Sequence, residues 1–195
     1  MRDALMQRFR PVFSEAAMRS FTIFVEHATA IEERDGDVVL RFPDDERARD
    51  LCIRPAAAPS KPWPPHPALA DFLGVSAELC FGELGGVSQL VLSDGYSGTL
   101  HLIGEDILPS EISYAPSLCA PIDIGHQAYY LFPPDGGERL WFIDEGPVEV
   151  ADSGEPIEIY FRELAYKLRT VNLDTPFQRA LGDAPHRSTW LVELA

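Results

Sequence analysis

The sequence predicts an α+β fold, with a largely antiparallel central sheet and helices packed at one face and at the N-terminus. In two segments, 14–32 and 157–168, apolar residues recur every three or four positions, which is typical of amphipathic helices. In two others, 85–103 and 128–143, short apolar and aromatic runs flank turn sequences, as in β-hairpins. Hairpins that are grouped apart from helices favour this fold class over one in which strands and helices alternate.

The first 54 residues are predicted to form a helix–strand–helix segment that packs on the main domain. Ser14 is the expected N-cap of the first helix. The sequence Asp35-Gly36-Asp37 then predicts a turn into a strand at 38–42. Three acids at 44–46 favour a second short helix that runs through Leu51, because acidic side chains stabilise the first turn of a helix.

Residues 55–67 contain six of the 17 prolines and are predicted to be an extended connector. The main α+β domain is expected to follow, over residues 68–195. Its predicted elements are a short helix from Pro67 to about Leu73, a hairpin that pairs 85–92 with 99–103, a hairpin that pairs 128–132 with 139–143, the helix at 157–168 and a last strand at 189–194.

The charge of the chain is concentrated in its middle. Residues 62–138 contain no lysine or arginine and ten acids, so they contribute −10 to the net charge of −15. The first 61 residues are nearly balanced, with 10 basic and 11 acidic side chains. A surface of one sign attracts basic proteins and repels phosphate groups, so we expect a basic protein partner and no binding to nucleic acid or to anionic membranes.

The remaining composition favours a cytoplasmic protein. The N-terminus lacks the apolar run of a signal peptide, and nowhere are there ~18 consecutive apolar residues that could span a membrane. Cys52, Cys80 and Cys119 are odd in number and widely spaced, which indicates reduced thiols and neither a disulfide framework nor a zinc site.

No motif specifies an enzyme, a cofactor or a metal. The glycines lack the spacing of a phosphate-binding loop, the acidic clusters lack the spacing of a calcium loop, and the GxSxG and HExxH patterns are absent. One alternative remains open, a hydrolase or transferase in which Cys119 is the nucleophile and Asp123 and His126 assist it. We expect a protein that is not an enzyme and that needs no cofactor.

The stretch from Leu118 to Leu168 resembles the second half of a SUKH domain, the Smi/Knr-type superfamily. The shared order is an apolar segment with a proline turn, an aromatic strand, a second aromatic strand that ends in an acid, and a short run into a Phe/Leu helix. It is seen here in Leu118-Cys119-Ala120-Pro121-Ile122-Asp123-Ile124-Gly125, Ala128-Tyr129-Tyr130-Leu131, Leu140-Trp141-Phe142-Ile143-Asp144, Val150-Ala151-Asp152-Ser153, and Phe161, Leu164 and Leu168. The resemblance implies a compact α+β domain that acts by binding proteins, as do the immunity proteins of this superfamily, which neutralise toxins of bacterial competition systems.

Charge and resemblance together predict an immunity or inhibitor protein that covers a basic toxin. A regulatory scaffold, whose N-terminal segment binds a partner, is the alternative. The oligomeric state is not predicted. The residues expected to bind the partner are acids with one aromatic among them: Asp94, Tyr96, Glu105, Asp106, Glu111, Asp123, Asp144 and Glu145.

Overall fold

The computed structural model describes residues 1–42, 50–56, 67–83, 86–90, 122–124, 128–132, 139–144, 149–151, 155–170, 176–180 and 190–193. Over these ranges the chain forms one antiparallel sheet of ten strands, which lie side by side in sequence order. The strands are β1 (Ala30–Arg34), β2 (Asp37–Arg41), β3 (Asp50–Pro55), β4 (Ser76–Glu83), β5 (Gly86–Leu90), β6 (Ile122–Asp123), β7 (Tyr129–Leu131), β8 (Trp141–Ile143), β9 (Glu149–Ala151) and β10 (Leu191–Glu193). The helices are α1 (Arg2–Phe9), α2 (Glu15–His27), α3 (Pro67–Leu73), α4 (Pro156–Thr170) and α5 (Pro176–Ala180).

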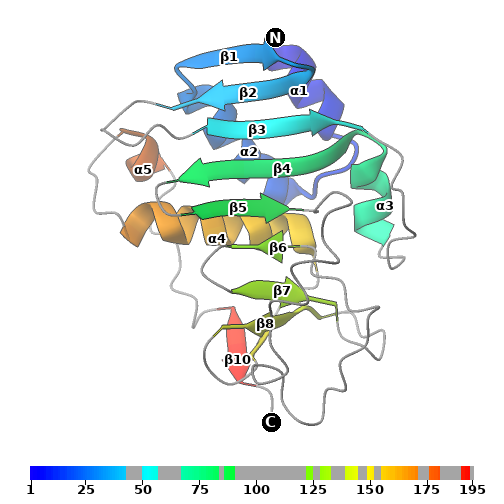
Figure 1. Ribbon diagram of the computed structural model, residues 1–195, viewed down its shortest axis with the longest axis vertical. Helices are drawn as coiled ribbons and strands as arrows, with labels where there is room; N and C mark the ends of the chain where they lie inside the picture. Colours follow the sequence, from blue (N-terminus) through cyan, green and yellow to red (C-terminus); the bar gives the residue numbers. More distant parts are fainter. Residues whose placement is uncertain are drawn as a thin grey trace.

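The helices lie mainly behind the sheet in the view of Figure 1, with α1 and α2 behind β1–β4 and α4 behind β5. This arrangement confirms the predicted α+β fold with an antiparallel sheet. The strand β1 forms one edge of the sheet, and β10 lies at the opposite end of the molecule.

The main hydrophobic core fills the space between the sheet and the helices. Alternate residues of β2–β4 point into it, and α2 and α4 supply phenylalanines that contact one another. Phe24 of α2 packs edge-on against Phe81 of β4, with 6.2 Å between ring centroids, and lies 5.6 Å from Phe161 of α4. The buried residues form one continuous cluster that includes members from α1 to Leu191, so a single core joins both halves of the chain.

Side-chain hydrogen bonds stabilise both N-terminal helices. Ser14 caps α2 as predicted, because its Oγ accepts a hydrogen bond from the backbone N–H of Ala17 at 3.1 Å. The Arg8 guanidinium of α1 donates two hydrogen bonds to the backbone carbonyl of Val75, in the turn between α3 and β4. The N-terminal helix is thereby tied to the middle of the chain.

The strand β1 was not predicted, since the expected helix extended to residue 32. In the structure α2 ends at His27, and Ala28 adopts an extended backbone (φ −62°, ψ 127°) that starts the strand. The following turn confirms the prediction from Asp35-Gly36-Asp37. Asp35 and Gly36 both have positive φ, 54° and 91°, as the two-residue turns of β-hairpins require.

The predicted second short helix is wrong in the part that the structure describes. Asp50 and Leu51 begin β3, which pairs with β2 on one side and β4 on the other. At Asp50 and Leu51 the central position of β3 in the sheet and the burial of Leu51 decide for a strand; the rest of the predicted helix, before Asp50, lies outside the described ranges. The register shifts between Arg54 and Pro55, where proline lacks the N–H that a ladder needs.

The connector and the domain boundaries stay predictions. Residues 57–66 are outside the described part of the chain, while α3 confirms the short helix that was expected after them. Because β3 is hydrogen-bonded to β4 across the connector, the first 55 residues share a sheet with the rest.

In the second half, β7 and β8 confirm the predicted hairpin, and α4 and β10 confirm the last helix and strand. The first predicted hairpin is confirmed only for its strand β5; residues 99–103 are not among those described. β5 pairs with β4 and β6, two strands that were not predicted.

Candidate functional site

Most of the residues predicted to bind a partner fall outside the described ranges. This applies to Asp94, Tyr96, Glu105, Asp106, Glu111 and Glu145, and to Cys119 and His126 of the alternative catalytic site. Two predicted residues are placed, Asp123 in β6 and Asp144 directly after β8.

The sheet register places Asp123 and Asp144 at the same end of β6 and β8, two strands that are separated by β7. Tyr129 of β7 pairs with Asp123 on one side and with Ile143, the neighbour of Asp144, on the other. Asp144 is partly buried and has an interaction partner within the chain.

The aromatic residues of this hairpin serve mainly as core. Tyr130 and Phe142 are buried, at 0% and 2% exposure, and their rings lie 4.9 Å apart. Tyr130 therefore cannot anchor a partner at the surface, whereas Trp141 is partly exposed.

Tyr130 also belongs to a buried polar cluster. Its hydroxyl donates to Glu163 Oε1 of α4 at 2.6 Å and accepts from Trp190 Nε1 at 3.1 Å. Glu163 is fully buried, and such a carboxylate needs donors to offset its loss of hydration. The cluster joins β7, α4 and the residue that precedes β10.

The best-defined surface is the face of β1–β4 that points away from the helices, here named the outer face. Its residues alternate with the core residues of the same strands and lie opposite one another in the register. They are Glu32, Arg34, Asp37, Val39, Arg41, Asp50, Cys52, Arg54, Glu78 and Cys80.

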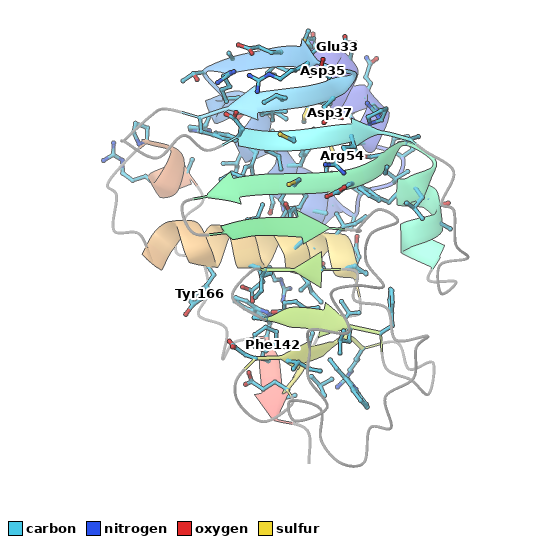
Figure 2. All side chains as sticks on the ribbon, in the orientation of Figure 1. Glu33, Asp35, Asp37, Arg54, Phe142 and Tyr166 are labelled. Atoms are coloured by element: carbon cyan, nitrogen blue, oxygen red, sulfur yellow. The ribbon has the colours of Figure 1, made fainter. Side chains whose placement is uncertain are left out.

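The charged groups of the outer face form a network of ion pairs. Glu32 Oε2 lies 3.2 Å from Arg41 Nε and 3.9 Å from Arg34 Nη2. Arg41 also reaches Asp50 at 3.8 Å, and both of these acids hold the pKa of the Arg41 guanidinium above its usual range. Figure 2 shows that Asp37 and Arg54 lie on neighbouring strands, with Glu33 and Asp35 toward the edge at β1.

Glu78 is the acid of this face that is deepest in the protein. It is 1% exposed, and its Oε2 is 2.7 Å from Arg54 Nη1, whose side chain is 43% exposed. Burial raises the pKa of the Glu78 carboxyl, Arg54 acts in the opposite direction, and Asp37 raises it slightly. Beside Glu78, the Ser76 hydroxyl donates a hydrogen bond to the backbone carbonyl of Arg54 at 2.7 Å. This bond joins β4 to β3 at the place where the register shifts.

Three residues were not assigned to these sites from the sequence: Glu78, Cys80, which was predicted only to be a reduced thiol, and Glu163. The first two could have been found, because Ser76-Ala77-Glu78-Leu79-Cys80-Phe81 alternates outward and inward residues as a half-buried strand does. Glu163 had no such signal, because a glutamate in the middle of an amphipathic helix is ordinarily exposed.

The described residues contain no group of three or more metal-ligating side chains, and no helix in the ranges given above is long and apolar enough to cross a membrane. Comparisons of the chain with protein-family models, with curated proteins and with solved structures found no match.

Proposed function

We propose that this chain is a protein-binding domain without catalytic activity, an immunity or inhibitor protein that neutralises a basic toxin in a bacterial competition system. The observation that carries the proposal is the division of charge along the chain. Residues 62–138, here named the base-free segment, have ten acids and no lysine or arginine, whereas the flanking segments contain both signs.

The contacts of the outer face support this division. The bases Arg34 and Arg41 each lie within 4.0 Å of an acid of the same strands, Glu32 or Asp50, so these charges of the N-terminal strands offset one another. A further base of these strands, Arg54, pairs instead with Glu78, an acid of the base-free segment. Asp71 of the same segment is exposed on α3. A basic partner would supply the positive charges that this segment does not contain.

The proposal also rests on the resemblance to SUKH domains, whose immunity members act by covering a toxin. An acidic surface of this kind accelerates the encounter with a basic partner at low ionic strength, and salt reduces the acceleration. The partner is therefore expected to be a protein of high pI, and the rate of association is the quantity to measure.

The test uses the product of the reading frame next to this gene. First, co-expression of the present chain should restore growth to cells that this product kills. Second, the association rate of the two purified proteins is measured at several salt concentrations. In one variant Asp94, Glu105, Asp106 and Glu111 are replaced by lysine. The matched control replaces Asp3, Glu15, Glu26 and Glu33, which are exposed acids of the N-terminal segment, and changes the net charge equally.

The first variant should associate ~10–100-fold more slowly at low salt and lose most of its dependence on salt. The control should slow association several-fold less, since its substitutions lie outside the base-free segment. Equal rates for the two variants, or an adjacent product that neither harms cells nor binds, would contradict the proposal.

A further inference from the structure

Two cysteines face each other across adjacent strands. Cys52 of β3 and Cys80 of β4 are direct partners in the antiparallel register, so their side chains point to the same side of the sheet. Directly opposite residues have Cα atoms ~4.5–5.5 Å apart, which is within the range that a disulfide spans. Neither cysteine is in a disulfide in this structure and both are partly exposed, so a small reagent can reach them.

The surroundings of Cys52 favour its protonated thiol. Burial, and after it the acids Asp50 and Asp37, raise the pKa of Cys52, and Arg34 and Arg54 offset only part of this effect. A disulfide is strongly oxidising when the dithiol that it forms on reduction is stabilised as a thiolate. Because Cys52 lacks that stabilisation, a disulfide here would form slowly at neutral pH and would resist reduction once formed.

We propose that Cys52 and Cys80 constitute a redox modification site, at which a cross-strand disulfide forms by exchange with a small disulfide such as oxidised glutathione. The proposal goes beyond the proposed function and does not depend on it.

The exchange takes place in two balanced steps. One cysteine, as its thiolate, attacks a sulfur of oxidised glutathione, forms a mixed disulfide and releases one glutathione thiolate. The second cysteine loses its proton to solvent and attacks the protein sulfur of that mixed disulfide, which releases the second glutathione. The protein loses two protons and two electrons, and oxidised glutathione takes up both to become two molecules of glutathione.

The disulfide would close a loop over residues 53–79, which contains the proline-rich connector and α3. A cross-link of this kind restricts the unfolded chain and ties β3 to β4 next to the Arg54–Glu78 ion pair. The oxidised protein should therefore melt roughly 5–10 °C higher than the reduced one.

The site is tested by peptide mapping of the full chain after incubation with oxidised glutathione at about pH 8.5, where more of the thiol is ionised. Cleavage before aspartate places the three cysteines in separate peptides, Asp50–Ala70, Asp71–Ser93 and Asp106–Ile122. Trypsin is unsuitable, because Arg54 and Lys61 precede prolines and the next basic residue is Arg139. The expected product is a disulfide between the first two peptides.

Two variants separate this pair from Cys119. The Cys119→Ser chain should still form the disulfide and show the higher melting temperature after oxidation, whereas the Cys80→Ser chain should show neither. A disulfide to the Asp106–Ile122 peptide or to a second chain, a glutathione adduct that never resolves, or thiols that stay reduced in excess oxidant would each overturn the proposal. The mapping of the unsubstituted chain gives this answer even if a variant fails to fold.

Discussion

The ion pair of Arg54 and Glu78 joins an exposed guanidinium to a carboxylate that is 1% exposed. Burial raises the folded-state pKa of Glu78 above its unfolded value. The folded protein therefore binds this proton more tightly than the unfolded chain does. The resulting contribution to stability is fully present below the unfolded pKa and is lost as the pH rises through the folded pKa. Arg54 limits that loss by favouring the charged carboxylate.

Replacement of Arg54 by methionine keeps most of the aliphatic stem and removes the charge. The pKa of Glu78 should rise further, and the free energy of unfolding at about pH 7 should fall by about 1–3 kcal/mol. At about pH 4, where Glu78 is largely protonated in either protein, the difference should become small. Urea denaturation at the two pH values measures both quantities.

The matched control is Arg19→Met, because Arg19 pairs with Glu15 at 3.2 Å with both side chains well exposed, at 70% and 90%. That change should cost less than about 0.5 kcal/mol at either pH. If the Arg54 variant lost the same stability at both pH values, its effect would come from packing and not from the charge of Glu78.

Among the elements, the helices with strong periodicity and the hairpin with a clear turn could be predicted from the sequence. Helix α2, helix α4 and the β7–β8 pair were recognised because local pattern and tertiary packing agree there. β1 and β3 could not be recognised in the same way. The helical spacing of α2 continues past His27 by chance, and the acids at 44–46 favoured a helix whose predicted end, Asp50 and Leu51, lies in β3. Pairing with neighbouring strands decides both segments, and single-sequence patterns do not reveal it.

The cap of α2 makes a prediction at the same scale. Ser14→Ala removes the acceptor for the Ala17 N–H and should lower the free energy of unfolding by about 0.5–2 kcal/mol, while Ser14→Asp should retain most of it. Ser20→Ala is the control, since it makes the same chemical change within α2 and should be neutral or slightly stabilising. Thermal and urea unfolding followed by circular dichroism compare the three variants. Equal losses at positions 14 and 20 would contradict the role of the cap.

For the whole molecule, the sequence predicted the fold class but not the extent of the sheet. The uneven distribution of charge along the chain could be predicted, because it follows directly from the positions of the charged residues in the sequence. The ion pairs that neutralise the N-terminal strands depend on register, so the outer face could not be anticipated. Of the predicted partner-binding residues, Asp123 and Asp144 are brought to the same end of nearby strands by pairing with β7, which sequence spacing alone does not indicate.

Deletion of residues 1–54 tests whether the N-terminal segment is a separate module. The deletion removes α1, α2, β1, β2 and nearly all of β3. It exposes Phe81 and Phe161, which pack against Phe24 of α2 in the intact protein. The remaining chain should lose cooperative thermal unfolding and bind a hydrophobic dye. A sharp unfolding transition with intact near-ultraviolet circular dichroism would show instead that residues 55–195 fold independently. The full-length chain is the reference.

The sequential order of the strands has a consequence for how the protein folds. Each strand pairs with the next one along the chain, so hairpins such as β1–β2 and β7–β8 need only short loops to close. Three pairings require longer segments to close, namely 56–75 before β4, 91–121 before β6 and 152–190 before β10. Closing these three long segments costs the most chain entropy, and this cost arises before the contacts between the paired strands can stabilise the protein. We therefore expect the hairpins to form early and the docking of β10 to complete the native structure, since Trp190, which precedes β10, packs against Tyr166 of α4.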